Sequence, residues 1–168
     1  MKLYEGKISA AGKWFGIIVS RFNGAIADKL LDGAIDCLTR HSADTEKIDI
    51  FKVPGAFEVP QTLRQIVSPT HTQKYDGIIC LSAIIRGETT HFELLSHTIT
   101  REIENIAVES GIPVAYGVIT ADNLEQAIDR AGGKHGNKGF DAALSVMEQI
   151  GLRTIIYEKT DKGKRARS

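Results

Sequence analysis

Hydrophobic residues follow two alternating patterns along the chain. Four short runs rich in β-branched and aromatic residues alternate with longer segments in which apolar residues recur every three or four positions. Runs of the first kind are typical of β-strands, and the second period is typical of amphipathic helices. The runs predict strands over 14–20, 47–53, 75–85 and 113–120. The continuous apolar run inside 75–85 predicts burial on both faces, as in a parallel sheet.

A helical segment follows each predicted strand. In the first segment the apolar positions are spaced by four and form one stripe: Ile26, Leu30, Ala34 and Leu38. Further helices are predicted over 57–67, 90–110, 123–131 and 139–151, and Gly111 is the expected C-cap of the second of these. The order β-α-β-α-β-α-β-α-α favours parallel strands joined by right-handed crossovers. The expected fold class is therefore α/β, a three-layer α-β-α sandwich with a four-stranded parallel sheet.

Length and composition are typical of a soluble globular protein with one domain. The chain has 168 residues, of which 42% are hydrophobic and 25% are charged, and its polar stretch 68–74 is typical of a loop rather than a linker. No apolar run approaches the ~20 residues of a membrane-spanning helix. The N-terminus, MKLYEGKISAAGKW, lacks the apolar core of a signal peptide, which favours a cytoplasmic location.

Charge is balanced overall but uneven along the chain. The 21 basic and 21 acidic residues cancel, yet the last ten residues, KTDKGKRARS, carry five basic residues and one acidic residue. A short basic tail is more typical of a solvated, disordered segment than of a nucleic-acid contact. We therefore expect one domain over 1–158, a disordered tail over 159–168, and no nucleic-acid or membrane partner.

The two cysteines, Cys37 and Cys80, each lie inside an apolar segment. This placement favours buried free thiols. The sequence has no CxxC pair and no cluster of cysteine and histidine, so a metal site is not expected.

Four loops leave the carboxyl ends of the predicted strands, at 21–24, 54–58, 86–93 and 120–123. In an open parallel sheet, ligands bind in the crevice beyond these ends. Phe22 is a large aromatic residue in such a loop, where it could either cap the core or stack on a planar ligand. Gly55 either allows the backbone to approach a ligand closely or only forms a turn before a helix.

The third of these loops, RGETTHFE at 86–93, contains the spacing of a capping box in Thr90 and Glu93. A capping box explains how the helix begins without any ligand. A capping box does not require Arg86 or His91.

An anion site is the alternative interpretation of the same loop. The free N–H groups of a helix N-terminus, with Gly87 and the Thr89 hydroxyl, are suited to a phosphate group. At His91 the helix dipole disfavours an imidazolium ion and leaves a neutral imidazole that can accept a proton. Spacing alone leaves both a catalytic role and a plain capping role open.

A second polar cluster is DRAGGKHGNKG at 129–139, with its basic residues Arg130, Lys134, His135 and Lys138 among four glycines. It either connects two helices through glycine caps or binds an anion. It has neither the spacing of a P-loop nor that of a dinucleotide-binding loop, so both of those classes are excluded.

Taken together, SRFN, VPGAFEVP, IRGETTHFE, GVITADNLEQAIDRAG and KHGNKG occur in the order and approximate spacing found in one family. The chain resembles the lumazine synthases from YEGK to MEQIG. The resemblance implies condensation of 5-amino-6-(D-ribitylamino)uracil with 3,4-dihydroxy-2-butanone 4-phosphate, a transferase reaction of riboflavin biosynthesis that needs no metal or organic cofactor. Alternatives are an archaeal-type riboflavin synthase, and a non-catalytic flavin- or lumazine-binding or shell protein of the same fold.

The resemblance also implies a role for each matching residue. Phe22 would stack on the pyrimidine, Glu58 would accept hydrogen bonds from the ribityl hydroxyls, and His91 would transfer protons. The other matching residues of this subunit are Ala56 and Phe57 for the ribityl chain, Ile84 and Ile85 for the pyrimidine, and Gly87, Glu88 and Thr89 for the phosphate.

The family's site lies between two subunits, which implies further residues on the neighbour. These are Tyr116, Arg130 on the phosphate and Lys138 near the pyrimidine; relatives often carry Phe in place of Tyr116. Family members form pentamers, and some build shells of 60 chains. The compact GGKHGNKG and the initial YEGK favour the 60-mer here. The resemblance also allows a neighbour's N-terminal strand to join the sheet, and it names riboflavin synthase as a partner to consider.

Overall fold

The computed structural model describes residues 1–68 and 73–165, with the backbone alone for 160–165. Four parallel strands form one sheet in the order β2-β1-β3-β4. The strands are β1 (Phe15–Ser20), β2 (Ile48–Val53), β3 (Gly77–Ile85) and β4 (Val114–Ala121). They lie within one or two residues of the predicted runs, so the predicted parallel sheet is confirmed.

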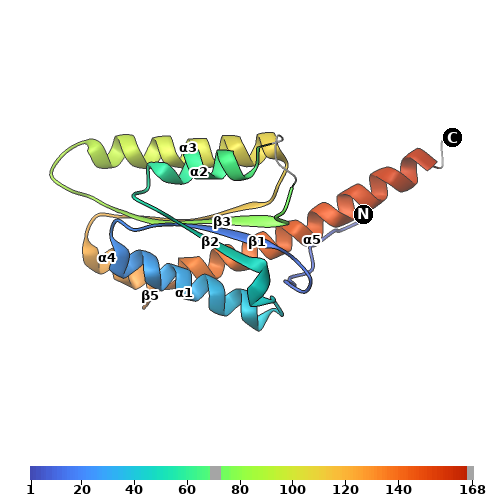
Figure 1. Cartoon of the computed structure of the whole chain (residues 1–168), viewed down its shortest axis with the longest axis horizontal. Helices are drawn as coiled ribbons and strands as arrows, with labels where there is room; N and C mark the ends of the chain where they lie inside the picture. The colour runs from blue at the N-terminus through green and yellow to red at the C-terminus, as the bar shows by residue number, and fades with distance from the viewer. Residues whose placement is uncertain (69–72, 166–168) are drawn as a thin grey trace.

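Helices cover both faces of this sheet (Figure 1). On one face lie α2 (Glu58–Ile66) and α3 (His91–Ser110), and on the other lie α1 (Gly24–Arg40), α4 (Leu124–Arg130) and α5 (Lys138–Arg165). A short 3-10 turn, Thr45–Lys47, precedes β2. Gly111 ends α3 in the left-handed conformation, as predicted for its C-cap. The three-layer α-β-α sandwich is confirmed.

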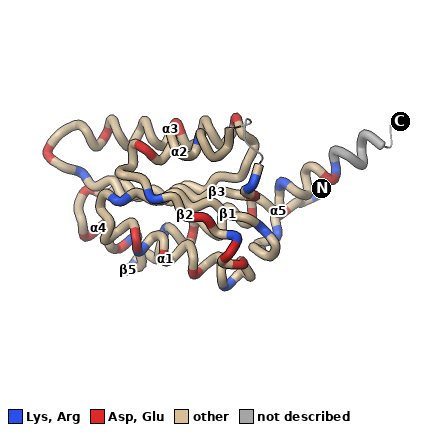
Figure 2. Tube along the Cα trace, viewed as in Figure 1, with Lys and Arg blue, Asp and Glu red and all other residues tan. Residues whose placement is uncertain are grey.

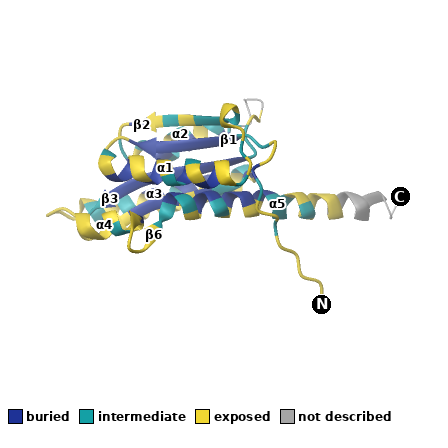
Figure 3. Ribbon diagram, turned by 90° about the horizontal axis from the view of Figure 1, so that it is seen from below, coloured by how far each residue is buried: buried dark blue, intermediate teal, exposed yellow. Residues whose placement is uncertain are grey.

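Strand residues alternate between two apolar clusters. Ile17 and Ile79 pack with α1 and α5, whereas Ile18 and Ile78 pack with α2 and α3. Every residue of β1 is buried, and Figure 3 shows this strand dark, whereas the edge strand β2 is largely exposed or intermediate. Neither β1 nor β3 contains a charged residue, and the charges lie mainly on the outer helices and loops (Figure 2).

Buried polar groups within the sheet are paired. The hydroxyls of Ser20 and Ser82 lie 2.8 Å apart at 2% and 0% exposure. Cys37 and Cys80 are free and buried, as predicted. Burial raises the pKa of Cys37 to about 11 and that of Cys80 to about 12, so both thiols stay protonated near neutral pH.

The N-terminal residues 1–10 form neither helix nor strand and cross α5 instead. A side chain on Gly6 would lie 1.8 Å from the Glu148 carbonyl, so the two backbones touch. Among the described residues, no further strand pairs with the outer edge of β2, and Ile50 there is 43% exposed. The strand expected from a neighbouring subunit stays a prediction.

The last helix is longer than the stretch 139–151, where the sequence predicts its beginning. In the structure α5 continues to Arg165 and extends away from the sheet (Figure 1). Gly151 lies inside the helix, where a Cβ would be 2.6 Å from the Lys7 nitrogen. This glycine therefore allows the N-terminal segment to approach α5 and does not end the helix. The stretch expected to be a disordered tail, 159–168, is helical to Arg165, and 166–168 lie outside the described residues.

The remaining sequence predictions concern a polar loop and membrane-spanning helices. The loop predicted at 68–74 lies largely outside them. No helix within them combines the length and hydropathy needed to cross a bilayer.

The predicted capping box at the start of α3 is wrong. Thr90 is the N-cap, but its φ of −67° and ψ of 1° are not the extended backbone that side-chain capping requires, and its side chain makes no cap hydrogen bond. Glu93 instead accepts a hydrogen bond from Arg86. The other oxygen of Glu93 is buried without a partner among the described residues.

Arg86 joins three elements at this point. Its Nε donates to Asp122 beyond β4 at 2.8 Å, another of its nitrogens donates to Glu93 on α3, and its guanidinium lies 4.3 Å from the centre of the Phe92 ring. Its backbone N–H also donates to Ala121 at 2.9 Å. We call these contacts the Arg86 clamp. The clamp holds the start of α3 against the ends of β3 and β4.

The clamp predicts how stability depends on pH. The hydrogen bond from Arg86 holds the pKa of the Glu93 carboxyl below its ordinary value of 4.5. A lowered pKa gives stability that is fully present above the unfolded value and is lost as pH falls through the folded value. Glu93→Gln should therefore destabilise the protein most near pH 7, and the deficit should shrink towards pH 3. Denaturant unfolding at several pH values measures this difference.

Thr90→Ala is the matched control. Without a cap bond to lose, its free energy of unfolding should stay within about 0.5 kcal/mol of wild type. A deficit in Glu93→Gln that is constant from pH 7 to pH 3, or a loss near ~1 kcal/mol in Thr90→Ala as expected for a true cap, would contradict this account.

Candidate functional site

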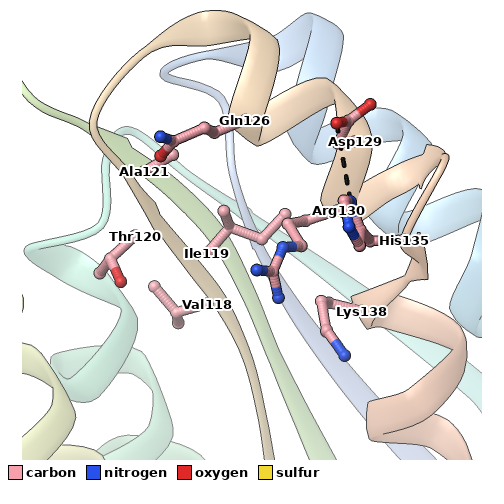
Figure 4. A pocket seen from close by; sticks show the side chains of 9 residues that line it. All are labelled: Val118, Ile119, Thr120, Ala121, Gln126, Asp129, Arg130, His135 and Lys138. Carbon is pink, nitrogen blue, oxygen red and sulfur yellow. Dashed lines mark ion pairs between the residues drawn. The ribbon is translucent and has the colours of Figure 1, made fainter.

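Two cavities open near the carboxyl ends of the strands, and they share no lining residue. The first, which we call the aromatic cavity, has a volume of about 440 Å³. It is lined by Phe22, Asn23, Gly55, Ala56, Phe57, Ala83, Ile84, Ile85, Gly87, Thr89, His91, Phe92 and Leu95. The second, the basic cavity, also measures about 440 Å³. It is lined by Val118, Ile119, Thr120, Ala121, Gln126, Asp129, Arg130, His135 and Lys138 (Figure 4).

The aromatic cavity presents two exposed rings on a fixed backbone. Phe22 is 72% exposed and Phe57 is 57% exposed. Backbone hydrogen bonds join their loops, because Arg21 donates to Val53 at 2.8 Å and Phe22 donates to Pro54 at 3.0 Å. A ring with this exposure does not cap the core of this chain, and stacking of Phe22 on a planar ligand stays a prediction.

Asn23 contributes to this cavity, and sequence reasoning missed it. Its backbone has a φ of 56°, in the left-handed region that Asn tolerates better than most residues. Its side-chain amide donates to the Ala83 carbonyl at 2.9 Å. Asn23 therefore fixes the start of α1, and with it the Phe22 loop, to the end of β3. The only sequence signal was an Asn at a helix start.

The turn before α3 is open to a ligand. A Cβ built on Gly87 meets nothing within 4 Å, so the backbone there is accessible. His91 is the first residue of α3, and its exposed side chain lines the cavity beside Thr89. The cavity thus combines an imidazole, a hydroxyl and the N-terminus of a 20-residue helix.

Two predicted residues lie outside the lining of the aromatic cavity. The carboxylate of Glu58 accepts a hydrogen bond from the Gly55 N–H at 2.8 Å and so closes the turn before α2. Glu88 is exposed. The cavity does bring together Phe22, Ala56, Phe57, Ile84, Ile85, Gly87, Thr89 and His91.

The basic cavity lies beside β4 and α4. Lys138 is paired with Asp141 at 2.7 Å, and His135 lies 3.6 Å from Asp129. Among the described residues, no acidic group lies within ion-pair distance of Arg130. Figure 4 shows the Arg130 guanidinium projecting into the cavity. Arg130 is therefore the cation best placed to bind an external anion.

Tyr116 lines neither cavity. It belongs to β4, on the same face as Val118 and Thr120, because strand residues alternate between faces. Its hydroxyl forms a 2.7 Å hydrogen bond with the Thr100 hydroxyl of α3. Burial raises the pKa of Tyr116, so its hydroxyl stays protonated. The hydroxyl that Phe lacks thus fixes the ring to α3.

Most of the predicted site residues therefore line two different cavities of the chain, and Glu58, Glu88 and Tyr116 line neither. The aromatic cavity supplies apolar surface, three phenylalanine rings and an imidazole, whereas the basic cavity supplies cations. Within the described ranges, no three His, Cys, Asp or Glu side chains are grouped as a metal site requires.

Comparison with known proteins identifies the family. Residues 12–154 match the family model described as 6,7-dimethyl-8-ribityllumazine synthase. Two proteins of that name, from two strains of Clostridium kluyveri, are each 50% identical to this chain over 152 residues. Each alignment covers 90% of this chain and 97% of the relative. The chain belongs to the 6,7-dimethyl-8-ribityllumazine synthase family.

Proposed function

We propose that this protein condenses 5-amino-6-(D-ribitylamino)uracil with 3,4-dihydroxy-2-butanone 4-phosphate to 6,7-dimethyl-8-ribityllumazine, releasing phosphate and water. The observation that carries this proposal is the aromatic cavity, where an exposed ring on a fixed loop lies beside a helix N-terminus that begins with His91. Mixing the purified protein with both substrates tests it, because the product has characteristic near-ultraviolet absorbance and fluorescence. A binding or shell protein would form no product, and an archaeal-type riboflavin synthase would instead consume added lumazine.

The residues fit a reaction that depends on positioning and proton transfer. Imine formation, loss of phosphate and ring closure each move protons, and none needs a covalent enzyme intermediate. Holding two substrates in reactive geometry contributes several kcal/mol, and a general base contributes ~10²–10⁴-fold. We assign the stacking of the pyrimidine to Phe22 and the proton transfers to His91.

The phosphate of the second substrate is assigned to the turn Gly87–Thr89. This turn precedes the N-terminus of α3, where free N–H groups and the helix dipole favour an anion. The Arg86 clamp pairs the nearby carboxylates of Glu93 and Asp122. Their negative charge is thereby offset beside the proposed anion site. The exposed side chain of Glu88 can point away while its backbone N–H faces the phosphate.

The complete site is proposed to lie between adjacent subunits. The aromatic cavity contains no Lys or Arg, although one substrate is a phosphate ester. The basic cavity supplies Arg130 and Lys138 without an exposed aromatic ring. Placing one subunit's aromatic cavity against its neighbour's basic cavity supplies an aromatic ring for the pyrimidine and cations for the phosphate at one site. Such a heterologous contact repeats around a closed ring.

The proton-transfer role of His91 can be tested by mutation. His91→Ala should lower kcat by ~10–10³-fold, at the lower part of the general acid–base range because the uncatalysed condensation is feasible. The exposed imidazole makes no packing contact that the fold requires, so the melting temperature should hardly change. Steady-state kinetics and thermal unfolding measure the two effects. Wild-type turnover in the variant would exclude His91 as the proton-transfer group.

The second prediction concerns mixed rings. His91→Ala and Arg130→Ala each damage a different cavity. If the two variants are unfolded together and refolded as mixed rings, about one interface in four should pair two intact cavities, since each face is wild type half the time. Activity at low concentration of the phosphate substrate should then rise well above that of either variant refolded alone.

Mass spectrometry provides the control by showing that the rings contain both variants. A site built within one chain cannot be restored by mixing. Confirmed mixed rings with no more than the average activity of the two parents would exclude the shared site.

The third prediction concerns assembly. We propose a pentameric ring and favour a shell of 60 chains, in the cytoplasm, with riboflavin synthase as a candidate partner for the product. The support is the compact link between α4 and α5, which spans only residues 131–137. Light scattering at neutral pH should give the mass of 60 chains. The mass of five or ten chains, with phosphate present to occupy the sites, would contradict the shell.

A further inference from the structure

A short hairpin, which the sequence pattern did not predict, joins α4 to α5. It consists of β5 (Ala131–Gly133) and β6 (Gly136–Asn137). Lys134 and His135 form its turn, and Gly132 and Gly136 in the two strands have φ of 109° and 76°, values that favour glycine. Strands of three and two residues cannot hold such a hairpin in place by themselves. Contacts outside the hairpin must therefore position it.

The hairpin carries the two main cations of the basic cavity at its open end. Ala131 pairs with Asn137 across the ladder, and Arg130 and Lys138 are the residues just outside this pair. Any shift of Asn137 therefore moves the backbone of both cations.

The side chain of Asn137 connects three segments. Its Oδ1 accepts hydrogen bonds from the N–H groups of Gly139 at 2.8 Å and Phe140 at 3.2 Å, which caps the start of α5. Its Nδ2 donates to the Lys29 carbonyl of α1 at 2.8 Å, 108 residues away in sequence. One amide thus caps α5 and ties the hairpin to α1.

Glycines make this close contact possible. A Cβ on Gly33 of α1 would lie 2.3 to 2.5 Å from three atoms of the Asn137 side chain. A Cβ on Gly139 would lie 1.9 Å from the Leu30 carbonyl. The hairpin is therefore seated directly on the α1 backbone, with no room for an intervening side chain.

We propose that Asn137 is a positioning residue, which holds Arg130 and Lys138 at their working positions by tying the hairpin to α1. This inference rests on the proposed function, in which both cations contact substrate from the neighbouring subunit. An Asn is suited to the task because its oxygen serves the helix cap while its nitrogen serves the tether. The two tasks can be separated by mutation.

Asn137→Asp separates them. Asp caps a helix as well as Asn does, but it places an oxygen where the Lys29 carbonyl needs a donor. The melting temperature should stay close to that of the wild type. The KM for both substrates should rise roughly tenfold while kcat changes less, because displaced cations weaken the binding of both substrates more than the reaction itself. Inorganic phosphate should inhibit the variant correspondingly more weakly. Loss of a residue that only stabilised the fold would lower the melting temperature and would not raise KM at an unchanged melting temperature.

Gly33→Ala tests the same contact from α1 and leaves Asn137 intact. Ala favours a helix over Gly by roughly 1 kcal/mol, and the obstructed atoms are the end of one side chain, which can move aside. This variant should fold and show the same rise in both KM values. Asp32→Ala, at the exposed neighbouring position of α1, is the matched control and should behave as wild type.

Arg130→Ala and Lys138→Ala distinguish a failure of the positioning role of Asn137 from a failure of the proposed role of the basic cavity. If these variants raise KM but Asn137→Asp and Gly33→Ala do not, Asn137 is only a helix cap and the inference is wrong. If all four keep wild-type KM values, the proposed role of the basic cavity fails first, and no positioning role remains for Asn137.

Discussion

Burial of the central strands on both faces is the constraint on which the site depends. β1 and β3 carry no charged residue and pack against helices on either side. Each fully buried Ile or Leu in such a layer contributes about 1.5–3 kcal/mol relative to an exposed one. Because the strands are parallel, their carboxyl ends meet at one edge. The loops that carry Phe22, Phe57 and His91 are distant in sequence. They lie close together at this edge because the strands that precede them are neighbours in the sheet.

The same sheet also separates the two cavities. β4 lies at the edge of the strand order, and the basic cavity lies beside it, whereas the aromatic cavity lies at the ends of β1 and β3. The two linings meet along the β3–β4 ladder, where Ile84 pairs with Thr120 and Ile85 pairs with Ala121. Under the proposed function, assembly into a ring places each aromatic cavity against the basic cavity of a neighbouring subunit.

Sequence reasoning succeeded where local periodicity decides the structure. The strands, the stripe of α1 and the left-handed cap at Gly111 follow from such patterns. It failed where one particular side-chain or backbone contact decides. Glu93 pairs with Arg86 rather than the helix end, Gly151 gives space to the N-terminal segment, and the hairpin depends on the bond from Asn137 to Lys29. For the site, the resemblance already assigned Arg130 and Lys138 to a neighbouring subunit. The structure adds that they line a separate cavity and that Asn23 lines the aromatic one.

The Arg86 clamp illustrates why exposed ion pairs can matter for function more than for stability. Its three partly exposed side chains gain little net free energy from pairing, since water already solvates each charge. The pairs affect the position of α3 more than its stability, because they hold its first turn against the ends of β3 and β4. In this way the pairs fix the direction in which the free N–H groups of α3 point. They also pair two carboxylates beside the turn assigned to the phosphate. An unpaired Glu93 would repel an incoming dianion across a short distance in a partly desolvated site. Under the proposed function, the arginine thus lets the helix N-terminus act on the phosphate from this subunit, without opposition from unpaired carboxylates.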